Sequence, residues 1–339
     1  MIRSVETLLK GIRGIHEAIR AEVVATTERT SLATLSTVVA EQAGDAVFAI
    51  DRVSEAVLLK HFEELGQHWS FVLIAEGVGE DGVVVFPRGS EPDKVELRII
   101  IDPIDGTRGL MYQKRPAWIL TGVAVNRGAQ TNIADIELAI QTEIPLVKQH
   151  LSDSLWAIKG QETGGERYNR LTGERFALQP SPSQKLSIAQ GYGGISRFFP
   201  GARAELAAID DEVVGQLLGP RRAGEAQAFE DQYICSGGQL YELLMGHDRW
   251  IADLRPLIEP VLNLRGEAQG LCCHPYDLCT ELIAREAGII VTDERGKPLA
   301  APLDVNTNMS WIGYANRTLY EQVAPVLTSI LEQRGLLNQ

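Results

Sequence analysis

The sequence predicts a mixed α and β protein, and three observations support this. Near both ends of the chain, apolar residues recur at three- and four-residue steps, which is typical of amphipathic helices. Between these ends lie short apolar runs bounded by Gly, Pro, Asp or Glu, which are typical of buried strands. Apolar residues make up 45% and charged residues 23% of the 339 positions, the composition of a globular protein with a sizeable core.

The first half of the chain is predicted to begin with two helices and to continue with strands. Residues 2–25 carry an apolar stripe at helical spacing. A short strand is then expected to lead through Asp51 into a second helix, with Ser54 as its N-cap. Apolar runs predict further strands. The first begins at residue 71 and stops at Glu76, and the others cover residues 83–86, 95–101, 118–125 and 133–140.

The second half is predicted to alternate helices with short strands. A Pro- and Ser-rich stretch near residue 180 separates an N-terminal α+β subdomain, residues 1–180, from a C-terminal α/β subdomain, residues 181–339. Asp277 is the expected N-cap of a helix that ends at Gly288. The other helices are expected at 236–246 and 316–334, and a strand at 289–292.

Charge and cysteine usage limit the function classes. The net charge of −13 argues against a nucleic-acid partner or an anionic membrane surface, because both require a basic face. The amphipathic N-terminus resembles neither a signal peptide nor a membrane span, so a cytoplasmic location is the default expectation. The group Cys272, Cys273, His274 and Cys279 lacks the CxxC spacing of a zinc site, which favours buried, reduced thiols.

The stretch RIIIDPIDGTRGL, residues 98–110, places two carboxylates at the end of an apolar strand. Asp102 and Asp105, with Glu76 at another strand end, would repel one another unless a cation lay among them. Carboxylate oxygens select hard ions such as Mg²⁺, Mn²⁺ or Ca²⁺. Gly106 allows close approach of the backbone to a ligand, and the amides of Gly106 and Thr107 can face an anion such as phosphate.

Two phosphatase chemistries compete for such a motif. Covalent aspartyl phosphatases of the haloacid dehalogenase type use the pattern DxDGT, in which the first Asp attacks phosphorus. Here the corresponding position is Pro103, which has no nucleophilic atom. Attack by a metal-activated water is therefore favoured over the covalent route.

Residues 102–107 resemble the DPIDGT motif of the inositol monophosphatase family, the lithium-sensitive, Mg²⁺-dependent phosphatases of the fructose-1,6-bisphosphatase-like superfamily. Segments 48–58, 73–80 and 274–299 are similar to other motifs of that family, in the same order. The resemblance implies a layered αβαβα sandwich of the sugar-phosphatase type, an α+β fold, and a homodimer. It further implies hydrolysis of a small phosphorylated metabolite without a covalent phosphoenzyme.

The same resemblance implies a role for individual residues. The implied metal ligands are Glu76, Asp102, the carbonyl of Ile104, Asp105 and Asp277. They would hold two or three Mg²⁺ ions, with Mn²⁺ as an alternative and Li⁺ as an inhibitor. Thr107 paired with Asp51, or Glu76, would accept the proton of the attacking water. The amides of Gly106 and Thr107 would bind phosphate oxygens, and Asp253 is a weaker candidate for contacting substrate hydroxyls.

The identity of the substrate stays open at this point. Inositol phosphate, fructose bisphosphate, histidinol phosphate and 3′-phosphoadenosine 5′-phosphate all suit the metal site, and an inositol-phosphate-like polyol is favoured. Arg108, Lys114 and Arg115, and more weakly Arg197, would balance a second phosphate unless they are solvated loop charges. The sequence after Thr107 departs from the family pattern, which leaves a catalytically weak metal- or partner-binding protein as a further alternative.

Overall fold

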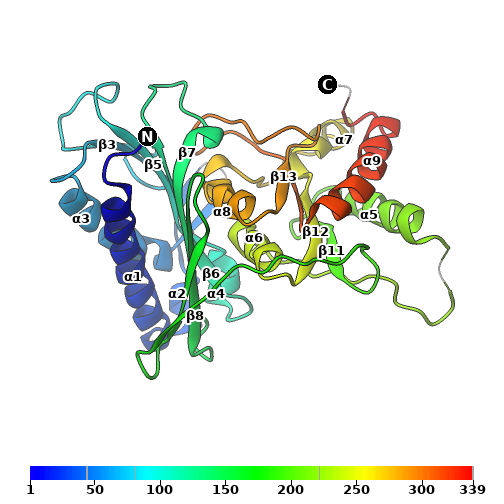
Figure 1. The fold of residues 1–339 in the computed structure, drawn as a ribbon, viewed down its shortest axis with the longest axis horizontal. Coiled ribbons are helices and arrows are strands. Elements are labelled where there is room, and N and C mark those ends of the chain that lie inside the picture. The colour runs from blue at the N-terminus through cyan, green and yellow to red at the C-terminus, as the bar shows by residue number, and fades with distance from the viewer. Residues whose placement is uncertain (43–44, 80, 221, 338–339) are drawn as a thin grey trace.

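The chain folds into five alternating layers in a computed structural model that describes residues 1–42, 45–79, 81–220 and 222–337. The main helices cover the outer face of an eight-stranded sheet, lie between this sheet and a four-stranded one, and cover the far face of the smaller sheet (Figure 1). In that order they are α1 (Val5–Arg29) and α3 (Ala49–Leu65), α6 (Ser236–Leu244) and α8 (Glu281–Glu286), and α5 (Arg203–Leu218) and α9 (Arg317–Gln333). The predicted αβαβα sandwich is confirmed.

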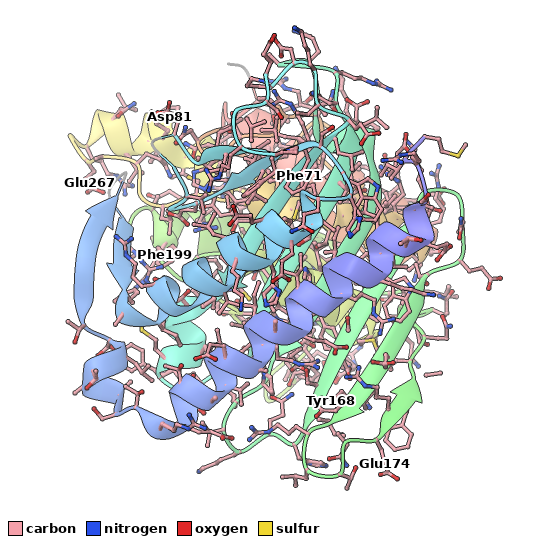
Figure 2. The ribbon with its side chains drawn as sticks, turned by 90° about the vertical axis from the view of Figure 1, so that its left-hand side faces the viewer. Phe71, Asp81, Tyr168, Glu174, Phe199 and Glu267 are labelled. Atoms are coloured by element: carbon pink, nitrogen blue, oxygen red, sulfur yellow. The ribbon has the colours of Figure 1, made fainter. Side chains whose placement is uncertain are left out.

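The eight-stranded sheet has the order β10-β9-β8-β7-β6-β5-β3-β4. Its strands are β3 (Phe71–Ala75), β4 (Val83–Phe86), β5 (Leu97–Asp105), β6 (Ala117–Val125), β7 (Ile136–Ile144), β8 (Leu151–Ile158), β9 (Gly164–Asn169) and β10 (Arg175–Ala177). Strands β3 and β5 pair in parallel, and Figure 2 shows α1 and α3 lying across the strands of this sheet. Because parallel strands end at the same sheet edge, Glu76 after β3 and the Asp102–Asp105 end of β5 reach a common edge.

The end of β5 is bulged, and the bulge decides where its two carboxylates face. In the pairing with β6, Asp102 lies opposite Leu120 and Asp105 opposite Trp118, so three steps along β5 match two steps along β6. On a regular strand, residues three apart point to opposite faces. The one extra residue therefore turns Asp102 and Asp105 toward the same face.

The four-stranded sheet has the order β11-β12-β14-β13, with β11 (Tyr192–Ile195), β12 (Asp248–Asp253), β14 (Trp311–Tyr314) and β13 (Ile290–Thr292). Its strands all follow residue 191, whereas those of the large sheet end at Ala177. Helices α6 and α8 pack against strands of both sheets. A subdomain boundary at residue 180 stays a proposal, because this shared helix layer joins the two halves. The remaining strands, β1 (Val38–Gln42) and β2 (Asp45–Phe48), form an antiparallel pair.

Two predicted helix caps are wrong. Helix α3 begins at Ala49, and the Asp51 carboxylate accepts the N–H of Phe48 at 2.8 Å, while Ser54 lies inside the helix and donates to the carbonyl of Asp51 at 2.7 Å. Asp277 lies in a 3₁₀ turn, Pro275–Leu278, ahead of α8. In both places an Asp in the first turn accepts the backbone N–H of the residue three positions before it. The polar residue that marks the helical turn in the sequence therefore lies inside the turn and not at its N-cap.

Strands β8, β9 and β10 were not among the predicted elements. Ser152, Asp153 and Ser154 of β8 are buried although they are polar. Asp153 is bound by Arg167 of β9 through two bonds of 2.7 Å, and the Ser152 hydroxyl donates to the carbonyl of Glu143 at 2.8 Å. Strands whose buried positions are polar show no apolar alternation in the sequence.

Among the described residues, no helix combines the length and apolar character needed to cross a bilayer.

Helix α1 carries a histidine into the interior of the protein. His16 has no exposed surface, and its ring nitrogens lie 2.9 Å from the hydroxyl of Thr142 and 2.7 Å from that of Thr121. Burial, together with the charges of Arg20 and Arg13, lowers the pKa of His16 to about 3. The imidazole is therefore neutral in the folded protein across the physiological range.

This burial predicts an acid-sensitive fold. The pKa of His16 is depressed on folding, so its contribution to stability is complete above the unfolded value of 6.5 and is lost as the pH falls toward about 3. Between pH 7 and pH 5, we expect the wild type to lose about 2 kcal/mol more unfolding free energy than His16→Gln. Denaturant unfolding of both proteins at the two pH values measures the difference. An equal loss in both would contradict the prediction.

Candidate active site

A cavity opens where the end of β5, the start of α3, the start of α6 and the 3₁₀ turn at Pro275–Leu278 meet. Acidic residues dominate one part of its lining: Asp51, Glu76, Asp102, Asp105 and Asp277. Three arginines also line it, namely Arg52, Arg108 and Arg255. The cavity therefore combines a cluster of carboxylates with cationic groups from three separate segments.

The carboxylates of Asp102, Asp105 and Asp277 form the core of this cluster. One ligand atom of each lies within 4.8 Å of the others. Burial raises the pKa of Asp102 and of Asp105 well above the ordinary value, and the charges of the neighbouring acids, Asp277 included, raise both further. A cation among them would remove this repulsion. A set of hard oxygen donors held this closely fits Mg²⁺ or Mn²⁺.

Each of the three carboxylates is held in place by a backbone amide. Asp105 Oδ2 accepts the N–H of Gly237, in the first turn of α6, at 2.6 Å. Asp102 Oδ1 accepts the N–H of Ile104 at 2.9 Å, and Asp277 Oδ2 accepts that of His274 at 2.6 Å. Since an amide fixes one oxygen of each residue, the arrangement is rigid before any ligand arrives.

The turn after β5 brings Thr107 to Asp51. The Thr107 hydroxyl lies 3.0 Å from Asp51 Oδ1 and 2.9 Å from the carbonyl oxygen of Ile104. Gly106 has a φ of 96°, and a Cβ there would lie 3.1 Å from the sulfur of Cys235. Only glycine fits this left-handed, crowded position, so the backbone itself lines the cavity beside the carboxylates.

The structure places the remaining predicted site residues less uniformly. Glu76 lines the cavity but lies outside the group whose ligand atoms approach within 4.8 Å. Asp253 has no exposed surface, and its oxygens accept from Nε of Arg255 at 2.8 and 3.0 Å. Arg255 lines the cavity, and Asp253, the weaker candidate for contacting substrate hydroxyls, is not among the lining residues.

Of the basic residues that were predicted to balance a second phosphate, only Arg108 lines the cavity. Arg108 lines the cavity, with its guanidinium over the rings of Phe199 and Phe48 at 5.4 and 5.7 Å. Arg115 pairs instead with Asp231, Lys114 is exposed, and Arg197 pairs with Glu230. Those three residues are not part of the cavity lining.

Sequence reasoning missed Gly237 and Arg255. A signal for Gly237 exists in the Ser-Gly-Gly run at 236–238, which opens an apolar helix and leaves its first amides accessible. Arg255 follows Asp253 by two residues, but nothing in the sequence indicates that the pair is buried together. Cys272, Cys273 and Cys279 are buried free thiols, as predicted, and so is Cys235.

Comparison with solved structures identifies the fold. Fructose-1,6-bisphosphatase from Leishmania major, in its holo form, matches with a TM-score of 0.68 and 13% identity, over 96% of this chain and 93% of that chain. The chain has the fold of the inositol monophosphatases and fructose-1,6-bisphosphatases. A hypothetical protein from Pyrococcus horikoshii, described as similar to inositol-1 monophosphatase, matches with a TM-score of 0.62 and 17% identity, over 95% and 99% of the two chains.

A third structure with this fold is the extragenic suppressor protein suhB from Bartonella henselae. It matches with a TM-score of 0.62 and 13% identity, over 95% of this chain and 98% of that chain. No family model and no curated protein matches the sequence. The resemblance seen in the DPIDGT stretch is thus confirmed at the level of the fold.

Proposed function

We propose that the protein is a Mg²⁺-dependent phosphatase that hydrolyses a small phosphorylated metabolite without a covalent phosphoenzyme. The observation that carries the proposal is the convergence of Asp102, Asp105 and Asp277 beside the Gly106-Thr107 turn. Two of the structural neighbours named above are described as a fructose-1,6-bisphosphatase and as similar to inositol-1 monophosphatase, which supports the same chemistry.

The proposal includes a set of metal ligands. They are Glu76, Asp102, the carbonyl of Ile104, Asp105 and Asp277, which would hold two or three Mg²⁺ ions or Mn²⁺. When bound, such ions lower the pKa of a water molecule and offset the charge of a phosphoryl group. Li⁺ is the proposed inhibitor of this site.

The chain's own groups supply proton transfer and orientation. The Thr107 hydroxyl lies 3.0 Å from Asp51 Oδ1, so a proton from the attacking water can pass through Thr107 to that carboxylate. Glu76, at the end of β3, is the alternative acceptor. The backbone amides of Gly106 and Thr107 donate to phosphate oxygens and hold the phosphate beside the acidic cluster.

Two arginines favour a bisphosphate as a second candidate substrate class beside a polyol monophosphate such as inositol monophosphate. The guanidinium carbons of Arg108 and Arg255 each lie 5.4 Å from the ring centroid of Phe199, and both residues line the cavity. Asp253 is occupied by Arg255 and offers no oxygen to a substrate hydroxyl. A second phosphate would meet cationic groups on this wall.

Phosphate release from a panel of substrates tests the proposal. The panel contains inositol monophosphate, histidinol phosphate, fructose 1,6-bisphosphate and 3′-phosphoadenosine 5′-phosphate, each with Mg²⁺, with EDTA and with added Li⁺. We expect release with Mg²⁺ that EDTA abolishes and Li⁺ reduces, because the acidic cluster needs a hard cation. No release from any substrate, by folded protein that binds Mn²⁺, would overturn the phosphatase proposal in favour of a metal- or partner-binding protein.

We also propose a homodimer. Light scattering on the purified protein would contradict this with a mass near 37.2 kDa, that of a single chain.

A further inference from the structure

Strand β7 carries a buried amide that connects the two helices of the middle layer. Gln141 has no exposed surface. Its Nε2 donates to the carbonyl oxygen of Gly237 at 2.7 Å, and its Oε1 accepts from the hydroxyl of Thr280 at 3.2 Å. Gly237 lies in the first turn of α6, and Thr280 directly precedes α8. One side chain therefore links two segments that are far apart in the sequence.

The same two segments position two of the three central carboxylates. The N–H of Gly237 donates to Asp105 Oδ2 at 2.6 Å, so the amide that binds Asp105 and the carbonyl bound by Gln141 belong to the same residue. Thr280 follows Asp277 by three residues and lies between the 3₁₀ turn that holds Asp277, which ends at Leu278, and the start of α8. Gln141 thus contacts the residue whose N–H binds Asp105 and a residue three positions after Asp277.

Both segments lie directly against strand β6 of the large sheet, which is the neighbour of the strand that carries Gln141. A Cβ on Gly237 would lie 2.7 Å from Cδ2 of Leu120, which is the register partner of Gln141 on β6. A Cβ on Gly122, two residues further along β6, would lie 2.7 Å from the carbonyl oxygen of Cys279. Close packing of this kind sets the distance of each segment from the sheet, but it has little directional preference parallel to the sheet. Hydrogen bonds are directional, so the amide of Gln141 can fix the lateral positions.

We infer that Gln141 is a positioning residue that sets the separation of Asp105 and Asp277, and thereby the divalent-cation affinity of the site. The inference rests on the proposed function, since it concerns the same carboxylates. Mg²⁺ demands nearly ideal ligand geometry, so a small lateral shift of either segment lowers affinity. Partners that orient metal ligands from outside the coordination shell are commonly worth 10- to 100-fold in affinity or activity.

Mn²⁺ binding to the purified protein, measured by isothermal titration calorimetry without substrate, tests the inference. Gln141→Met keeps the length and volume of the side chain but loses both hydrogen bonds. We expect the Kd for Mn²⁺ to rise about tenfold. The matched control is Thr142→Val, the next residue on β7, whose hydroxyl contacts His16 and Ser154 at 2.9 Å on the opposite face of the sheet. It should bind Mn²⁺ as the wild type does.

A second variant distinguishes the two hydrogen bonds of Gln141, one to Gly237 and one to Thr280. Thr280→Val removes only the hydrogen bond on the Asp277 side and should raise the Kd by less than Gln141→Met. Because that bond is made to Gln141, the double variant should bind no more weakly than Gln141→Met alone. If Gln141→Met does not fold, Thr280→Val decides, and an unchanged Mn²⁺ affinity in that variant overturns the inference.

The remaining outcomes distinguish the inference from the proposed function. A wild-type Kd in folded Gln141→Met, or an equal loss of affinity in Thr142→Val, overturns the role of Gln141 and leaves the metal site standing. A wild-type protein that binds no Mn²⁺ overturns the metal site itself.

Discussion

Asp105→Asn and Asp277→Asn should each abolish Mg²⁺-dependent phosphate release while leaving the fold intact. Each substitution removes a ligand charge from the central cluster but almost no volume. An asparagine oxygen at position 105 can still accept the N–H of Gly237. We expect kcat/KM to fall at least about 100-fold, because electrostatic stabilisation of the transition state is lost.

The same variants should show a distinctive stability pattern. Burial and neighbouring acidic charges raise the pKa of Asp105, so without metal its removal relieves repulsion and the variant should be at least as stable as the wild type. Mg²⁺ should stabilise the wild type by mass action and the variants much less. Thermal unfolding in EDTA and in Mg²⁺ measures both effects.

The control for these variants is Asp81→Asn. Asp81 is exposed between β3 and β4, away from the cavity lining, and is labelled in Figure 2. The Asp81→Asn substitution removes one negative charge without removing a proposed ligand. The variant should keep full activity and should still be stabilised by Mg²⁺. Full activity in both Asp105→Asn and Asp277→Asn would show that the site assignment is wrong.

Asp253→Ala should have the largest effect on stability. Asp253 has no exposed surface and is bound to Arg255, which is 9% exposed. Removal of one partner of a buried ion pair leaves the other charge uncompensated, which costs about 3–5 kcal/mol of unfolding free energy. Urea or guanidinium denaturation, followed by circular dichroism, measures the loss.

An exposed ion pair provides the comparison. Arg115 pairs with Asp231 near the protein surface, and Asp231→Ala should cost less than about 1 kcal/mol. The double variant Asp253→Ala/Arg255→Ala should lose less than the two single losses together, because no unpaired charge remains. If Asp253 instead contacts substrate, Asp253→Ala would raise KM with little loss of stability, and the structural role assigned to it here would be refuted.

The sequence alone determined the helices and strands that are built from local apolar patterns, and it predicted the chemistry of one motif. Helix α1, strands β3 to β7 and helix α9 follow from periodicity, since their buried faces are continuous along the chain. The DPIDGT stretch predicted a metal-dependent phosphate site because two carboxylates three residues apart at a strand end require a cation, and the following Gly-Thr amides can bind an anion. The resemblance of that stretch predicted the fold, which the structure confirmed.

The tertiary structure alone decided which distant residues meet. The bulge in β5 turns Asp102 and Asp105 to one face, and the packing of α6 supplies the amide of Gly237. Arg255 lines the cavity, while Asp253, the weaker candidate for contacting substrate hydroxyls, is buried against it. Each of these features depends on a partner that is remote in the sequence or on the register of a neighbouring strand. Local patterns record how a segment folds, but the partner of a buried polar group is fixed only when the layers pack together.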